Sequence, residues 1–179
     1  MKNMLPSILA LIALLLTNCG QINKENASFS IIGEYLSALD KAGFYGSVLV
    51  EINGEKIISN GYGYSDIEKQ IKNTPSTLYD IGSITKQFTS AAILKLEMEG
   101  KLSTTDKISK FFDNLPPDKE QITIHDLLRH QSGLISNVGR DFEKISEKEF
   151  LQKVLNTELQ FPVGTNFSYS NIGYSLLAM

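Results

Sequence analysis

The sequence predicts an α+β fold in which a helix and a β-hairpin are followed by helices alone. The first helix is indicated by apolar residues with helical spacing over 29–41. The hairpin is indicated by two β-rich runs, 46–52 and 55–59, joined by Asn53-Gly54, a dipeptide that type I′ turns favour. The later apolar segments all have helical spacing. A lone hairpin is marginally stable and has open edges, so helices must cover it or further strands must complete it.

The composition of the 179-residue chain is that of a globular protein with about one domain. Hydrophobic residues make up 42% and charged residues 21%, which separates the chain from disordered proteins. The formal net charge of −3 argues against a nucleic-acid partner. The single cysteine cannot form an internal disulfide, so packing must stabilise the core.

The first 28 residues have the pattern of an export signal followed by a polar tether. A basic start precedes an apolar run over 5–16, shorter than the about 20 residues that a membrane-spanning helix needs. The run ends at a sequence that resembles a bacterial lipobox, although Asn18 stands where a smaller residue is usual. The alternative is an ordinary cleaved signal and an unmodified thiol. We expect residues 1–18 to be a signal peptide and 19–28 a tether lipidated at Cys19, which would make the protein an exported lipoprotein, membrane-anchored and facing the periplasm or cell exterior.

The remaining elements follow in order along the chain. The polar stretch 66–77, which contains Pro75, is expected to be a loop. The strongest helical pattern, 83–99, is apolar around almost its whole circumference, which is typical of a buried helix. A short amphipathic segment is expected at 106–112, and further helices at 123–130 with Thr123 as N-cap, at 147–155, and from about Asn171 with Ser170 or Asn171 as N-cap.

Ser83 and Lys86 are the first candidate catalytic residues. They are three positions apart at a predicted helix start, which places both side chains on one face. Serine needs a base to remove its proton, and lysine serves only when neutral, a state that burial and the positive helix end favour. The N–H of Ser83 could also stabilise an oxyanion. Alone the pattern is weak, since a helix start with a solvated lysine explains it equally well.

Tyr169 and Asn171 form the second candidate element. A phenol can relay a proton, and a side-chain amide can both donate and accept hydrogen bonds. A turn that caps the following helix is the plain alternative. The order of the two elements carries more weight, because a serine–lysine pair followed by a tyrosine and an asparagine on a turn is a coherent constellation for acyl transfer.

The two histidines, His125 and His130, are expected to have structural roles. A triad of Ser83 with one of them and Asp126 is conceivable, but nothing in the spacing supports it and Lys86 already supplies a base. Five positions apart on a helix, the histidines do not share a face for a metal ion. No metal site is therefore expected.

Three blocks of sequence resemble the serine β-lactamase and penicillin-binding-protein family, especially class C β-lactamases and the related esterases and D-peptidases. The blocks are 81–89 around Ser83, 123–134, and 161–174 around Tyr169. Val163 departs from the pattern, since relatives often have a second proline there. The resemblance extends over about residues 30–179, and the order of the blocks makes it specific.

The resemblance implies a β-lactamase/transpeptidase-like fold, in which helices flank an antiparallel sheet and a helical subdomain is added. It implies that Ser83 is the acyl-accepting nucleophile, that Lys86 is its base and that Tyr169 shares proton transfer with Lys86. Asn171 would bind the substrate amide. The implied reaction is acyl transfer through an acyl-serine, with no metal or cofactor. Its substrates would be β-lactams, D-alanyl peptides of the peptidoglycan, or small esters.

The third motif of the family, a lysine or histidine followed by any residue and glycine on a late strand, has no candidate after Asn171. The apolar tail 172–179 looks like the start of a helix cut short. We therefore expect residues 29–179 to be the N-terminal part of the domain, with only its hairpin from the sheet and little turnover alone. The alternative is a non-catalytic lipoprotein, a decayed or binding-only relative.

Overall fold

A computed structural model of the protein describes residues 24–140 and 143–179. The predicted signal peptide and Cys19 lie outside the described residues. The chain divides into two compact units, the first ending at Tyr79 and the second running from Asp80 to Met179. A search of the described residues finds no helix long and apolar enough to cross a membrane.

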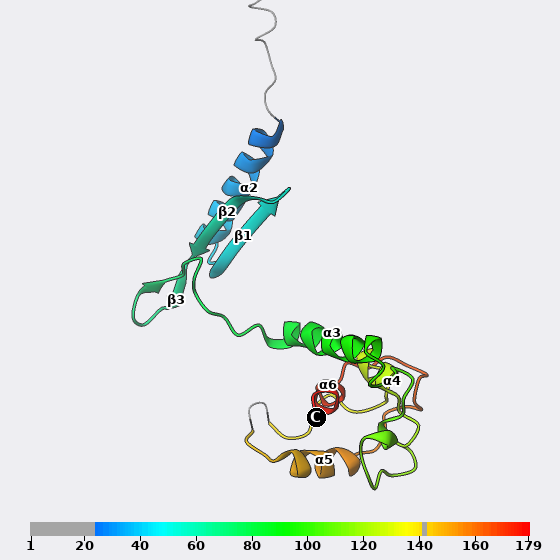
Figure 1. The fold of residues 1–179 in the computed structure, drawn as a ribbon. Helices are drawn as coiled ribbons and strands as arrows, with labels where there is room; N and C mark the ends of the chain where they lie inside the picture. The colour runs from blue at the N-terminus through cyan, green and yellow to red at the C-terminus, as the bar shows by residue number, and fades with distance from the viewer. Residues whose placement is uncertain (1–23, 141–142) are drawn as a thin grey trace, which may run out of the picture. The chain divides into compact units, whose positions relative to one another are not determined.

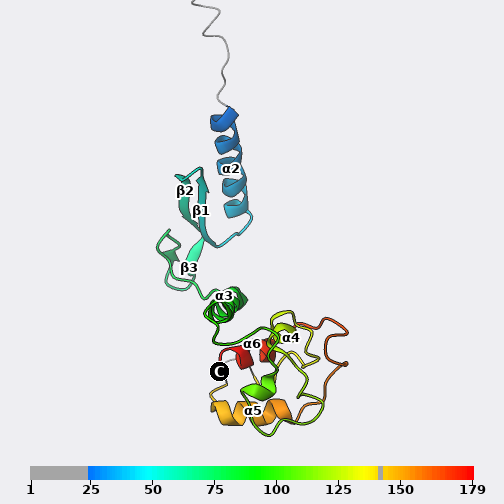
Figure 2. The same ribbon diagram turned by 45° about the vertical axis from the view of Figure 1, so that its right-hand side comes forward.

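In the first unit, a long helix lies along a β-hairpin, as Figures 1 and 2 show from two directions. The helix α2 spans Lys24–Lys41, and the strands β1 (Gly46–Ile52) and β2 (Glu55–Tyr62) pair antiparallel. Asn53 and Gly54 have φ angles of +53° and +81°, as a type I′ turn requires at both central positions. The predicted hairpin is therefore confirmed, and the helix begins five positions before its predicted start at residue 29.

A second small hairpin follows where a loop was expected. Strands β3 (Tyr64–Asp66) and β4 (Ile71–Lys72) pair antiparallel, so the loop predicted for 66–77 is wrong in part. Polar contacts hold this hairpin, for the Asp66 carboxylate accepts a hydrogen bond from the Lys69 amide, and the buried Asn73 side chain donates to the Tyr62 carbonyl. Its strands are too short to show the alternation of apolar and polar residues by which strands are recognised in a sequence.

The second unit is helical. A 3₁₀ turn, Gly82–Ile84, leads into α3 (Thr85–Met98). A further 3₁₀ turn covers Ile108–Lys110, and the later helices are α4 (Ile124–Leu128), α5 (Glu147–Leu155) and α6 (Asn171–Leu177). Both views place α6 between α3 and α5 (Figures 1 and 2). The predicted helices are present, although α4 ends two residues before 130.

Side-chain caps begin the later helices. Thr123 and Asp126 form a reciprocal capping box at α4, as the predicted cap at Thr123 requires. Ser146 caps α5, and Ser170 rather than Asn171 caps α6 by accepting a hydrogen bond from the Gly173 amide. Because Ser170 makes the cap, the side chains of Tyr169 and Asn171 on either side of it can bond to other residues.

The core of the second unit lies between α4, α5 and α6. Its buried members are Ile108, Ile122, Leu127, Leu134, Val154, Ile172 and Leu176. Helix α3 contributes Ile93 alone to the buried residues, whereas Phe88 and Met98 are 66% and 81% exposed. The prediction that α3 is buried all round is therefore wrong in this structure. An apolar circumference shows how much of a helix could be buried. Among the described residues, α6 packs against one side of α3, and the other side stays exposed.

Candidate active site

Ser83 and Lys86 meet at the start of α3. Ser83 lies in the 3₁₀ turn, Lys86 is the second residue of α3, and the Lys86 Nζ donates a hydrogen bond to Ser83 Oγ at 3.3 Å. One helical turn separates the two residues, so their side chains share a face as the spacing predicted. Ser83 is exposed and Lys86 is half-buried, which leaves the serine oxygen open to a ligand.

Tyr169 and Asn171 reach the same pair from the other end of the unit. The Tyr169 hydroxyl donates a hydrogen bond to Ser83 Oγ at 2.8 Å. Asn171 Oδ1 accepts one from Lys86 Nζ at 2.7 Å. The structure thus brings together all the side chains that the sequence singled out for acyl-transfer chemistry, and each makes a hydrogen bond to another.

A buried serine fixes the orientation of Tyr169 and Asn171. Ser170, which lies between them, is 1% exposed, and its hydroxyl donates to the Ile135 carbonyl at 2.7 Å while it caps α6. The neighbours of a residue held in this way are fixed in direction. The two flanking side chains therefore both face the start of α3.

Lys86 is the cation beside the Tyr169 phenol. Its Nζ lies 5.0 Å from the centroid of the Tyr169 ring, in a cation–π arrangement. Hydrogen bonding from Lys86, then from Ser83, lowers the pKa of the Tyr169 hydroxyl below its ordinary value of 10.0. These hydrogen bonds stabilise the phenolate, so at neutral pH a larger fraction of Tyr169 is in the deprotonated form that can accept a proton than of a free tyrosine.

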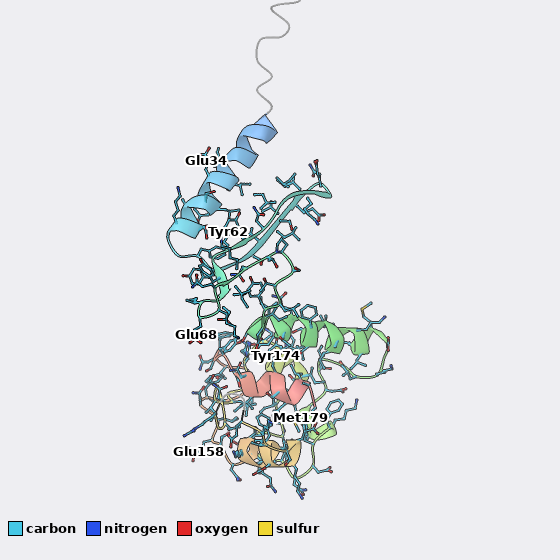
Figure 3. All side chains as sticks on the ribbon, turned by 90° about the vertical axis from the view of Figure 1, so that its left-hand side faces the viewer. Glu34, Tyr62, Glu68, Glu158, Tyr174 and Met179 are labelled. Carbon is cyan, nitrogen blue, oxygen red and sulfur yellow. The ribbon has the colours of Figure 1, made fainter. Side chains whose placement is uncertain are left out.

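Two supporting residues were not singled out from the sequence. Asn137 Oδ1 accepts a hydrogen bond from Asn171 Nδ2 at 2.8 Å, which fixes the orientation of the Asn171 amide. Tyr174, a residue of α6 (Figure 3), reaches α3 with its side chain: its hydroxyl donates to the Leu128 carbonyl and pairs with Ser90 Oγ of α3, each at 3.0 Å. Tyr174 follows Asn171 by three helical positions, a spacing that could have indicated it, whereas nothing in the sequence points to Asn137.

The two histidines have different surroundings. His130 packs against the Tyr169 ring with 4.5 Å between centroids, and its Nδ1 accepts a hydrogen bond from the Ser170 amide. His125 is exposed on α4. Among the contacts of the described residues, neither histidine makes a hydrogen bond to Ser83, and the same residues hold no cluster of three metal-ligating side chains.

A cavity of about 260 Å³ opens beside Asn171. Asn137, Val138, Arg140 and Phe150 contribute to its walls. Glu143 also contributes to its lining, so the walls combine amide, cationic, anionic and apolar side chains, and Asn171 is the residue of the site that reaches it.

The β-lactamase family profile matches residues 34–179. The match includes both units and every residue of the site just described. The chain therefore belongs to the β-lactamase family, and the resemblance found in the sequence is confirmed.

Two curated relatives from Staphylococcus aureus illustrate the similarity. Protein flp of strain NCTC 8325 is 39% identical over 141 residues, which cover 74% of this chain and 28% of the relative. Teichoic acid D-alanine hydrolase is 36% identical over 126 residues, which cover 70% of this chain and 31% of the relative. The chain thus spans less than a third of the length of these curated relatives.

Two solved structures confirm the fold class. The crystal structure of FmtA from Staphylococcus aureus superposes with a TM-score of 0.70 at 31% identity, over 86% of this chain and 43% of that one. A class C β-lactamase superposes with a TM-score of 0.73 at 24% identity, over 89% of this chain and 45% of that one. The described residues thus have the β-lactamase/transpeptidase-like fold. They match less than half of the length of each of these two structures.

Proposed function

We propose that Ser83 is the nucleophile of an acyl-transfer reaction that proceeds through an acyl-serine. The observation that carries this proposal is that Ser83 Oγ accepts hydrogen bonds from both Tyr169 Oη and Lys86 Nζ, at 2.8 and 3.3 Å. An exposed hydroxyl between two proton-transfer groups has the arrangement that nucleophilic catalysis needs. Membership of the β-lactamase family supports the same assignment.

The proposed steps follow from these contacts. The Ser83 hydroxyl loses its proton to the deprotonated Tyr169–Lys86 pair as Oγ forms a bond to the substrate carbonyl carbon. The tetrahedral intermediate then collapses, the bond to the leaving nitrogen or oxygen breaks, and Tyr169 returns the proton to that atom. The Ser83 N–H stabilises the oxyanion, and Asn171, oriented by Asn137, binds the substrate amide. Water then hydrolyses the acyl-serine.

For the substrate we propose a D-alanyl ester or D-alanyl peptide, with a β-lactam as the alternative acyl donor. A D-alanyl ester is suggested by one relative, teichoic acid D-alanine hydrolase, which is 36% identical over 126 residues. The chain spans 31% of that relative, so the whole reaction is a proposal for this chain. We expect turnover of the chain alone to be low, and acylation of Ser83 is therefore the step to measure.

We also propose that the protein is exported and lipidated at Cys19, on the strength of the sequence pattern over residues 1–20. Expression in a bacterium with and without globomycin, followed by mass spectrometry of the N-terminal peptide, tests this. A diacylglycerol-modified Cys19 that accumulates as a larger precursor under globomycin is expected. An unmodified thiol would rule out lipidation.

Acylation is tested on the whole chain with a fluorescent penicillin and a fluorophosphonate probe. We expect both probes to label the protein at Ser83, as peptide mass spectrometry would identify. Ser83→Ala should abolish the label, whereas Ser109→Ala, a matched change at an exposed serine of the same unit, should leave it unchanged. A chain that melts cooperatively and is not labelled by either probe would support the non-catalytic alternative.

A further inference from the structure

His130 has a backbone conformation that side chains rarely adopt. Its φ angle is +57°, in the left-handed region, at the end of α4. Histidine is among the residues that enter this region more readily than most, yet the conformation still has a cost. It directs the imidazole into a group of aromatic rings, since the centroids of Tyr169 and Tyr174 lie 4.5 and 5.1 Å away.

One hydrogen bond defines the proton state of this imidazole. The Ser170 amide donates to His130 Nδ1 at 3.1 Å. An amide can only donate, so the contact requires a bare Nδ1 and places the single proton of the neutral ring on Nε2. A proton on Nδ1 would set two N–H groups against each other and would break the bond.

The surroundings of His130 favour the same neutral state. Burial of the ring, then the positive charge of Lys86, lower the pKa of His130 below its ordinary value of 6.5. The titratable groups around it are Lys86 from α3, Tyr169 before α6 and Tyr174 within α6. Among the described residues, no carboxylate contributes to the charge at this imidazole.

We propose that neutral His130 is a positioning residue that holds Tyr169 against Ser83, and that protonation of His130 releases this hold and slows acylation of the serine. The link is Ser170, whose amide bonds to His130 and whose neighbours are Tyr169 and Asn171. A displacement of Ser170 therefore moves both side chains that contact Ser83 and Lys86. The consequence for acylation rests on the proposed function, whereas the positioning of Tyr169 does not.

His130→Asn is the informative variant. Asparagine tolerates the left-handed conformation and offers a side-chain oxygen as acceptor, but it does not titrate. His130→Ala removes the acceptor and the ring, and His125→Asn is the matched control at the exposed histidine of α4. With the fluorescent penicillin, we expect His130→Ala to acylate about 10- to 100-fold more slowly than the parent, because a small misplacement of a reacting group has an effect of this size. His130→Asn should recover most of that loss.

The pH dependence separates positioning from a general structural role. The pKa of His130 is below 6.5, so the imidazole becomes protonated only in acid. Acylation of the parent and of His125→Asn should therefore decline as the pH falls through the His130 midpoint. In His130→Asn only the decline caused by protonation of Tyr169 should remain, so its rate relative to that of the parent should rise as the pH falls through the His130 midpoint. The inference is overturned if His130→Asn keeps the same decline, or if folded His130→Ala acylates as fast as the parent.

Nuclear magnetic resonance on the parent chain tests the positioning without any acylation. The ¹⁵N signals of His130 should show a bare Nδ1 at neutral pH, and the Ser170 amide and Tyr169 ring signals should shift with the His130 titration. A proton on Nδ1, or Tyr169 signals that ignore the titration, would overturn the inference. If Ser83 fails to acylate while these shifts occur, the proposed function fails and the positioning role of His130 stands.

Discussion

The side chains of Lys86 and Asn171 meet at 2.7 Å, although 85 positions separate them in the chain. This contact joins the first turn of α3 to the first residue of α6. It therefore depends on the packing of the whole second unit.

Asn171→Ala is expected to reduce acylation of Ser83 by about 10- to 100-fold, because Lys86 loses its acceptor and swings away from the serine. Labelling rates with the fluorescent penicillin measure the effect. Asn166→Ala is the matched control, since Asn166 is exposed and contacts only its neighbour Thr165 in the hydrogen bonds of the described residues. Equal rates for Asn171→Ala and the parent would show that the amide has no role in acylation.

Tyr169→Phe is expected to slow acylation about 10²- to 10⁴-fold, the range for loss of a proton-transfer group. In the parent, acylation should rise as the phenol ionises, with a midpoint below pH 10.0 because its pKa is lowered. Tyr169→Phe should lose that alkaline rise, and Tyr35→Phe in the first unit should keep it. Phenolate absorbance of the parent minus that of Tyr169→Phe gives the midpoint independently. A midpoint at or above 10.0 would contradict the described hydrogen bonds.

Ser170→Ala is expected to destabilise the protein by about 1–3 kcal/mol. The change removes the cap of α6 and leaves the Ile135 carbonyl without its donor, at a residue that is 1% exposed. Ser146→Ala, which removes the exposed cap of α5, should have an effect of about 0.5–1 kcal/mol. Urea unfolding followed by circular dichroism measures both. Similar losses for the two serines would mean that the buried bond to Ile135 adds nothing.

Glu97→Gln is expected to reduce stability at neutral pH and to have less effect in acid. The Glu97 carboxylate accepts hydrogen bonds from the Thr104 amide and hydroxyl, which lower its pKa below 4.5. A lowered pKa in the folded state stabilises the protein above pH 4.5, and the contribution is lost as the pH falls through the folded pKa. The difference between parent and Glu97→Gln should therefore shrink below pH 4.5 in urea unfolding. Glu51→Gln, at an exposed strand position, should show no such pH dependence.

Local patterns predicted the site, because its residues are encoded by short motifs. Ser83 and Lys86 lie one turn apart, and Tyr169 and Asn171 flank a capping serine, so each pair is fixed by its own segment. The contact between these two segments was predicted from the resemblance to a family. Spacing alone contains no information on contacts between α3 and α6.

The features that the sequence did not predict depend on tertiary surroundings. His130 faces Tyr169 because the chain turns through a left-handed conformation that helical periodicity does not indicate. Asn137 orients Asn171 from a loop without a motif. The exposed face of α3 was predicted to be buried because composition describes a helix without its neighbours, as Phe88 at 66% exposure illustrates.

The burial of Ser170 also bears on how such a site can diverge. A change at Tyr169 or Asn171 alters a side chain at the surface of the unit and leaves the scaffold intact. A change at Ser170 alters the scaffold itself. Natural selection can therefore remodel the chemistry at two positions while the residue between them is retained.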